Sequence, residues 1–365
     1  MTLLIKIYHW FHEDIYSIPI RLIGFIGVIG ILFLPLFFPE SLQAPMMRMV
    51  IVGSLFAIYA ASWDLLAGFT GQVNLGHALF FGVAAYTAAL LNINLGWPPL
   101  VTIPLSAAVA AAAGVLMCLP ALRMRGIYLS LVTLAIPIIL SGFITLFKDF
   151  TGGEYGMSGI SSLGLPPLAI YYGVFIFMLI LALIMWKITD TRSKALRTGV
   201  ILRAIREDEI AARMCGIRTT RYKVLIFVLS GFFCGLAGGL YAHYFRVVGP
   251  STLELAFSFN AIVWTVFGGI GTIYGPIAGV FILYPLTEFA RFGALADYRF
   301  MMQAVILILV LIFMPQGIIT WIRDNIEQVC PRCKLINFTL RHNCRACSAP
   351  LHPEKTHTVQ ESAGA

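Results

Sequence analysis

The sequence predicts an all-α polytopic membrane protein of about ten transmembrane helices, followed by a small C-terminal tail that resembles a zinc ribbon. Three observations predict this class. Charged residues make up 12% and hydrophobic residues 59% of the 365-residue chain, whereas a soluble domain has roughly 25% charged residues. Long apolar runs recur along most of the chain, and two Cys-x-x-Cys pairs follow the last run. Two soluble domains, which the length alone would allow, are excluded by this composition.

The apolar runs locate the predicted helices. A helix needs about 20 apolar residues to cross a bilayer, and about 17 can suffice. The runs are 20–38, 48–67, 76–92, 99–120, 126–147, 167–187, 223–245, 254–268, 275–291 and 301–321. Glycines and a proline interrupt residues 268–276, so the eighth and ninth runs are either two short crossings or one re-entrant pair. The membrane domain is predicted over residues 20–322.

The two ends of the chain have different compositions. Residues 1–19 mix aromatic with charged side chains and are predicted to form an interfacial helix or a poorly ordered lead-in. The first apolar run begins only near Arg21, and no small-residue cleavage site follows it, so no cleavable signal peptide is predicted. Residues 353–365 are polar and are predicted to be disordered.

Basic residues set the predicted orientation in the membrane. Residues 187–223 contain ten basic and four acidic side chains, a difference of +6 in a chain of net charge +8. Since cytoplasmic loops carry an excess of Lys and Arg, this segment is predicted to be a large cytoplasmic loop, as is the loop with Arg123 and Arg125. Ten crossings would place both termini in the cytoplasm, whereas nine would place the tail outside. The basic balance needs no nucleic-acid partner.

The cytoplasmic loop carries the signals of a short helix. Asp208 is a suitable N-cap and Gly216 a suitable C′ residue, with about two turns of helix between them. Such a helix is unstable alone in water and needs a docking partner. Its apolar residues would give it one face to bury: Ile210, Ala211, Met214 and Ile217. The loop is therefore predicted to present this helix to a cytoplasmic partner, or else to be a solvated basic loop near anionic lipid.

Two glycine ridges predict close helix packing. Gly231, Gly235 and Gly239 recur at four-residue spacing in the seventh run, and Gly275 and Gly279 do so in the ninth. Small residues at this spacing allow helix backbones to approach closely in a membrane, where the hydrophobic effect does not drive helices together.

Polar residues at membrane depth are candidates for a path across the bilayer, because they usually face a bundle interior or an aqueous cavity. The candidates are Asp64, Gln72, Asn74, His77, Asn260 and Glu288. The glycines of "GQVNLGH" (71–77) predict a broken helix, which is tolerated only where protein or cavity water surrounds it. Gln72, Asn74, His77 and Asn260 either line a translocation path or make helix–helix hydrogen bonds, each of which contributes about 0.6 kcal/mol.

The tail, residues 323–352, carries the spacing of a metal site. Cys330-x2-Cys333 and Cys344-x2-Cys347 form two pairs separated by ten residues. Four thiolates can close around Zn²⁺ tetrahedrally, although the usual spacing between the pairs is roughly 15–20 residues. The alternative is a pair of disulfides, which would require an oxidising compartment. A cytoplasmic tail favours zinc, with His342 as a possible substitute ligand.

Four blocks, in order, resemble one family of membrane proteins. They are "LLAGFTGQVNLGHALFFGVAAYTAAL" (65–90), "LRMRGIYLSLVTLA" (122–135) with "TGGEYGMSGI" (151–160), "LRAIREDEIAARMCGIRTTRYKVLIFVLSGFFCGLAGGLYA" (202–242) and "VWTVFGGIGTIYGPIAGV" (263–280). Together they resemble the branched-chain amino acid permeases of ABC importers, of the LivM type. The resemblance covers about residues 48–320, and the cysteine tail departs from it.

The resemblance implies a bundle like that of type II importers in the inner membrane, with a second permease subunit, two separate ATPase subunits and an extracytoplasmic solute-binding protein. It implies that the loop helix docks in an ATPase groove, with these coupling residues: Arg206, Glu207, Asp208, Glu209, Ala211, Ala212 and Gly216. The chain has no GxxxxGK[ST] motif, so it is not expected to bind nucleotide or to be an enzyme.

Three alternatives stay open at this stage. A urea or amide importer would use a similar permease. An autonomous secondary transporter or channel would be expected to have ionisable pairs deep in the membrane. A membrane-anchored metal protein would leave the charged loop without a role.

Overall fold

The computed structural model describes residues 19–37, 39–121, 124, 126–191, 197–290, 298–330, 332–333, 336–339, 342–344 and 347–351. Its contacts divide the chain into two units, Phe38–Ile319 and Met1–Phe37 with Thr320–Ala365. The predicted interfacial segment (up to residue 18), the predicted disordered tail, Arg123 and Arg125 lie outside the described residues.

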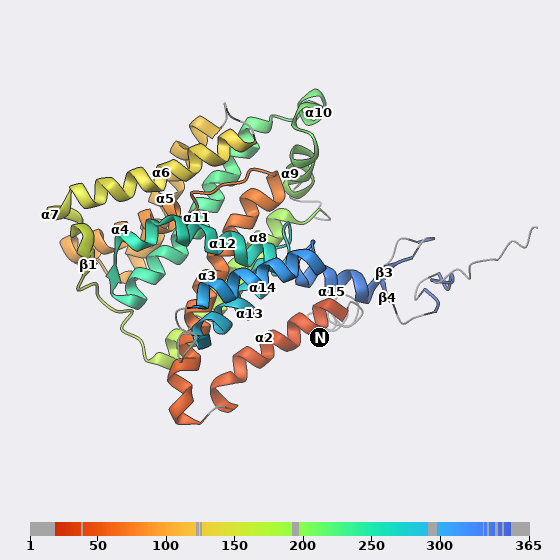
Figure 1. Cartoon of the computed structure of the whole chain (residues 1–365), viewed down its shortest axis with the longest axis horizontal. Helices are drawn as coiled ribbons and strands as arrows, with labels where there is room; N and C mark the ends of the chain where they lie inside the picture. Colours follow the sequence, from red (N-terminus) through yellow and green to blue (C-terminus); the bar gives the residue numbers. More distant parts are fainter. Residues whose placement is uncertain are drawn as a thin grey trace, which may run out of the picture. The chain divides into compact units, whose positions relative to one another are not determined.

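Nine of the ten predicted apolar runs correspond to one helix each, and the tenth, 301–321, covers α14 and the start of α15. The long helices are α2 (Pro19–Phe37), α3 (Glu40–Thr70), α4 (Ala78–Leu95), α5 (Pro99–Ala121), α6 (Ile127–Leu146), α8 (Pro167–Thr189), α11 (Thr219–Phe245), α12 (Leu255–Gly268), α13 (Tyr274–Ala290) and α14 (Arg299–Phe313). Figure 1 shows them as a helical bundle in the larger unit, apart from α2, which belongs to the other unit.

The structure does not confirm ten crossings. Seven segments of the described chain are long and apolar enough to cross a membrane. α12 has 14 residues and α13 has 17, and at about 1.5 Å per residue both are shorter than the hydrocarbon core of about 30 Å. In α2, which has 19 residues, the apolar stretch within the described side chains is Ile26–Pro35. The predicted runs thus fold as helices, and α12 and α13 are shorter than a full crossing.

Short elements connect the long helices. They are α7 (Lys148–Thr151), η2 (Gly153–Tyr155), β1 (Met157–Ser158), α9 (Thr198–Glu207), α10 (Glu209–Met214), β2 (Val247–Val248), η3 (Pro250–Leu253), α15 (Ile318–Ile326), β3 (Glu327–Val329) and β4 (Ile336–Phe338). β1 pairs antiparallel with β2, with Met157 opposite Val248, and β3 pairs antiparallel with β4. The fold is thus helical with two small two-stranded sheets. In the larger unit, α10 lies at one edge of the bundle and α7 and β1 lie at another (Figure 1).

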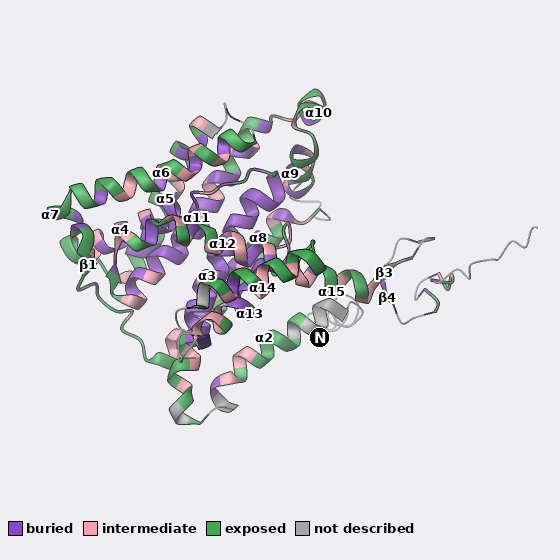
Figure 2. Ribbon diagram, viewed as in Figure 1, coloured by how far each residue is buried: buried purple, intermediate pink, exposed green. Residues whose placement is uncertain are grey.

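The core of the larger unit surrounds α3. In the best apolar window of α3, 94% of the residues are buried, against 22% in that of α6. α3 packs against α8, α11, α12 and α13, which explains why it is apolar on all sides rather than on one stripe. Figure 2 shows buried residues along α3 and exposed ones along much of α6 and α14. The exposed apolar side chains of these outer helices are suited to lipid or to another membrane subunit.

The first glycine ridge lies in the contact of α11 with α5. A Cβ on Gly231 would lie 2.7 Å from the carbonyl oxygen of Ala110, and one on Gly235 would lie 2.8 Å from the Cα of Ala107. A Cβ on Gly239 would also meet α5. Real Cβ atoms do not approach backbone this closely, so these three glycines allow the two helices to pack backbone against backbone.

The second ridge lies in the α12–α13 hairpin. A Cβ on Gly279 would meet the carbonyl oxygen of Trp264, and one on Gly275 would lie 2.5 Å from the carbonyl oxygen of Gly269. Gly269 and Gly271 have positive φ angles of 128° and 78°, which favour glycine. The chain therefore reverses sharply between two short helices in close contact.

Candidate functional site

The segment 71–77 is a non-helical break between α3 and α4. α3 ends at Thr70, the backbone from Gly71 to His77 is not helical, and α4 begins at Ala78. Gly71 has φ 70°, and its N–H donates to the carbonyl oxygen of Ala67 at 3.0 Å. This left-handed glycine ends the helix and starts the broken segment that the sequence predicts.

Neighbouring helices hold this backbone in place. The indole Nε1 of Trp63 in α3 donates to the carbonyl oxygen of Asn74 at 2.7 Å. From α6, the hydroxyl of Ser130 donates to the carbonyl oxygen of Val73 at 3.0 Å. Side chains thus replace the hydrogen bonds that a continuous helix would supply.

The second half of the segment is held in the same way. The N–H of Leu75 donates to the hydroxyl of Thr133 in α6 at 3.1 Å. The N–H of Ala78 donates to the hydroxyl of Ser258 in α12 at 3.0 Å. The broken segment is therefore a fixed structural element that joins α3, α4, α6 and α12.

His77 lies in a buried polar cluster. Its Nε2 is 2.9 Å from the hydroxyl of Ser62, and its ring centroid is 5.1 Å from that of Tyr59. The hydroxyl of Ser230 in α11 donates to the carbonyl oxygen of Ser62 at 2.7 Å. On this side His77 makes the helix–helix contact that the sequence allowed as one of two roles.

Several polar atoms of the segment have no protein partner. Within the described part of the chain, Nε2 of Gln72, Nδ2 of Asn74 and Nδ1 of His77 are buried and make no hydrogen bond. Such groups are rare in folded proteins. Asn260 on α12 and Glu288 on α13 are only partly buried. The structure therefore places three of the four predicted path residues together and leaves Asn260 on a more exposed face.

The loop helix forms where the sequence predicts it, as α10. Oδ1 of Asp208 accepts hydrogen bonds from the backbone N–H groups of Ile210 at 2.7 Å and Ala211 at 3.1 Å. Gly216 has φ 82°, and the N–H of the next residue, Ile217, bonds back into the last turn. Capping at both ends compensates for the shortness of the helix.

Glu209 attaches α10 to the start of α11. Its carboxylate pairs with Arg213 and with Nζ of Lys223 at 2.8 Å. Burial alone would raise the pKa of Glu209, but the hydrogen bonds and charges of Lys223 and Arg213 outweigh it and hold the pKa below its usual value. Glu209 is thus an internal link rather than an exposed contact.

The remaining face of α10 is apolar and exposed. Met214 is 85% exposed and Ile210 is 60% exposed, whereas Ala212 is buried on the opposite face. Glu207, Ala211 and Gly216 are also exposed.

Sequence reasoning missed α9, the helix directly before α10. Its signal was present, because Leu202 and Ile205 recur at helical spacing and both are buried. Arg206, near the end of α9, is exposed overall, but its Nη1 donates to the carbonyl oxygen of Gly68 in α3 at 2.5 Å. This predicted coupling residue therefore contacts the membrane bundle.

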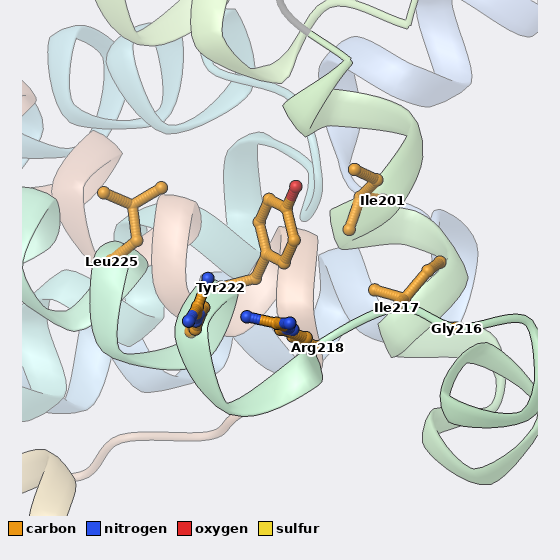
Figure 3. Close-up of a pocket in the computed structure, with 7 residues that line it drawn as sticks. Ile201, Gly216, Ile217, Arg218, Tyr222 and Leu225 are labelled. Carbon is orange, nitrogen blue, oxygen red and sulfur yellow. The ribbon is translucent and has the colours of Figure 1, made fainter.

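An open groove lies beside α10. It has a volume of about 580 Å³ and is lined by Ile201, Gly216, Ile217, Arg218, Arg221, Tyr222 and Leu225. Figure 3 shows the Tyr222 side chain between Ile201 and Leu225, with Arg218 beside it. The groove combines two guanidinium groups with aliphatic walls on the α9–α11 side of the loop.

The four tail cysteines gather in the smaller unit. Sγ of Cys330 is 3.5 Å from Sγ of Cys347, Sγ of Cys333 is 3.4 Å from Sγ of Cys344, and all four sulfur atoms lie within 4.8 Å of one another. Cys330 and Cys344 are buried with Leu351 in a small core. The thiols are too far apart for disulfides, whose S–S length is about 2.05 Å, so the geometry permits a four-thiolate metal centre.

A family model for the permease component of branched-chain amino acid transport systems matches residues 46–311. That range includes both the broken segment and the loop helix. The chain belongs to this permease family. The cysteine cluster lies beyond the matched residues.

Curated relatives of this permease have related roles. The high-affinity branched-chain amino acid permease LivM of Salmonella typhimurium is 29% identical over 297 residues, 75% of this chain and 69% of the relative. LivH of Escherichia coli is 25% identical over 303 residues, 77% and 95% of the two chains. The fructose import permease FrcC of Rhizobium meliloti is 24% identical over 301 residues, 77% and 80% of the two chains. No solved structure matches the permease.

Proposed function

We propose that this permease is one membrane subunit of an ABC importer that carries branched-chain amino acids, or a similar small polar solute, across the inner membrane. Separate ATPase subunits drive alternating access by moving α10. The observation that carries the proposal is the exposed apolar face of α10, on a helix that is capped at both ends and tied to the bundle by Glu209.

The exposed face of α10 supports a docking role for a physical reason. A helix of six residues does not persist alone in water, and exposed apolar side chains gain free energy only when a partner covers them. The basic residues of the loop around α10 favour the cytoplasmic side, where an ATPase would be found. With an even number of crossings, both termini lie on that side too.

The broken segment is proposed as part of the solute path. Buried amide and imidazole nitrogens without protein partners are sites where water or a polar solute completes the hydrogen bonds. The nitrogens of Gln72 and Asn74 are donors, which suit the carboxylate of an amino acid. A second permease subunit on the exposed outer helices and an extracytoplasmic solute-binding protein complete the proposed importer.

The solute is the part of the proposal that needs a direct test. The family match and the first relative support branched-chain amino acids, and the fructose permease shows that sequences at this distance serve another solute. The complex should be isolated through a tag on this chain and placed in proteoliposomes with ATP inside or outside. We expect copurified ATPase and ATP-dependent uptake of leucine, isoleucine or valine in preference to urea and fructose.

The outcomes separate the alternatives. Preferential uptake of urea or fructose would reassign the solute while keeping the importer. A chain that purifies without an ATPase, under detergent conditions in which a known ABC importer stays intact, would favour the autonomous transporter and contradict the proposal.

We further propose that the tail binds one Zn²⁺ through Cys330, Cys333, Cys344 and Cys347. Zn–S bonds of about 2.3 Å in tetrahedral geometry place sulfur atoms roughly 3.8 Å apart, which is close to the 3.4 and 3.5 Å of the two Sγ pairs. The metal would supply folding free energy to a core of few residues.

Metal analysis of the purified protein tests the zinc site. We expect about one zinc per chain, lost in Cys330→Ser and Cys344→Ser and retained in Cys215→Ser, whose exposed thiol lies elsewhere. Thiols that remain free and metal-free after purification with zinc would show that the cluster is not a zinc site.

A further inference from the structure

A three-way junction of backbone segments lies where the loop meets the membrane bundle. α3 ends at Thr70, so the carbonyl groups of its last turn lack helical partners. The N–H of Gly71 donates to the carbonyl oxygen of Ala67, and the guanidinium of Arg206 in α9 donates to the carbonyl oxygen of Gly68 at 2.5 Å. A cation at a helix C-terminus is also favoured by the helix dipole.

The third segment is the α12–α13 turn. Oδ1 of Asp64, one turn before Gly68 in α3, accepts the N–H of Gly271 at 2.8 Å. Asp64 is completely buried. One carboxylate thus holds the turn against α3, beneath the arginine of the loop.

The three segments approach closely at glycines. A Cβ on Gly68 would lie 2.7 Å from the backbone nitrogen of Gly271, and one on Gly271 would lie 3.1 Å from Nη1 of Arg206. A Cβ on Gly71 would lie 3.3 Å from Cγ of Arg206. Gly71 and Gly271 also have positive φ angles. Arg206 therefore contacts the end of α3, the start of the broken segment and the α12–α13 turn at once.

We propose that Arg206 and Asp64 are positioning residues that transmit movement of α10 to the solute path. A single residue, Asp208, separates α9 from α10, so displacement of α10 moves Arg206. Arg206 then moves the end of α3 with Gly71, where the broken segment begins, and Asp64 carries the α12–α13 turn along. Glu209 and Lys223 make a separate link to α11, so this junction is the connection to α3 and α12–α13.

This inference rests on the proposed importer, and its test uses the intact complex in proteoliposomes. The measurement is the amount of solute moved per ATP hydrolysed. In Arg206→Ala we expect this ratio to fall about tenfold, which corresponds to about 1.4 kcal/mol of lost coupling. Arg206→Lys should recover part of the loss, because it keeps the charge but not the planar fork. Arg203→Ala is the matched control, an exposed arginine on the same helix, and should keep the wild-type ratio.

A second measurement follows the movement itself. Spin labels on p-acetylphenylalanine in place of Val200 on α9, the helix that carries Arg206, and of Ile270, both exposed, report the separation of this loop helix from the α12–α13 turn without using thiols. In the otherwise wild-type complex this separation should be the same with and without trapped ATP, because the two elements move together. With Arg206→Ala it should change with nucleotide. Asp64→Asn, which keeps the size of the side chain and replaces one carboxyl oxygen by an amide group, should show the same effect in weaker form.

The outcomes are distinguishable. A wild-type ratio in both Arg206→Ala and Asp64→Asn, while deletion of 208–215 abolishes ATP-driven uptake, would overturn the junction and keep the importer. A separation that already changes with nucleotide in the complex without Arg206→Ala would also overturn it. No ATP-driven uptake by the wild-type complex would remove the proposed function, and this inference with it.

Discussion

Truncation of the exposed face of α10 should weaken binding of the ATPase by a calculable amount. Fully burying an isoleucine or methionine side chain contributes about 1.5–3 kcal/mol. Ile210 is 60% exposed and Met214 is 85% exposed, so docking can bury most of each. Replacement of either by alanine should therefore cost about 1–2 kcal/mol, which weakens binding about 5- to 30-fold.

The assay is the affinity of purified ATPase for the permease in nanodiscs, measured by thermophoresis at fixed salt. Val247→Ala provides the control, because this valine is 50% exposed in β2, away from α10. An affinity that stays within about twofold of wild type in both Ile210→Ala and Met214→Ala would refute the reasoning. The exposed face of α10 would then not be the docking surface.

Three further predictions follow from individual contacts. Gly235→Ala forces α11 away from α5 and should destabilise the purified protein by about 1–3 kcal/mol. Gly173→Ala, where a Cβ meets nothing within 4 Å, should be neutral or stabilising. Thermal unfolding in detergent compares the two variants, and equal shifts of the unfolding temperature would contradict the packing argument. Asp208→Ala removes the N-cap of α10 and should cost about 1 kcal/mol locally, seen as roughly fivefold faster amide exchange in 209–214 with exchange in α11 unchanged. Because the pKa of Glu209 is lowered, its ion pairs stabilise α10 fully at pH values above the usual pKa of 4.5, and this stabilisation is lost as the pH falls through the lowered pKa. Protection of the α10 amides from hydrogen exchange should therefore drop with acid in the wild type but be low and independent of pH in Glu209→Gln. An unchanged acid-dependent drop in this variant would assign the effect to another group.

Local signals predicted the local structure. The apolar runs located the long helices, because a membrane helix satisfies all its backbone hydrogen bonds within itself. Asp208 and Gly216 predicted the ends of α10, because a cap involves only groups a few residues apart. α9 was missed although Leu202 and Ile205 marked it, because the charges around them favoured a loop.

Contacts between distant residues could not be predicted in this way. The resemblance implied that Arg206 and Glu209 belong to the ATPase-coupling element. The structure adds contacts within the chain: Arg206 reaches Gly68, 138 residues away, and Glu209 pairs with Lys223. Asp64 was one of the polar candidates for the path, and in the structure it accepts the N–H of Gly271, 207 residues away. Ten full crossings were not confirmed, since α12 and α13 are short and reverse at a glycine turn.

By itself the sequence determined the class of protein, the order of the helices, the loop helix with its caps, the cysteine spacing and the family resemblance, because each depends on residue types within one short stretch. Only the tertiary structure decided which face of α10 stays exposed, which side of the bundle Arg206 contacts, and where α3 meets the α12–α13 turn. These outcomes depend on how closely backbones pack. That distance is set by glycines and side chains from several helices at once, so no single stretch of sequence contains it.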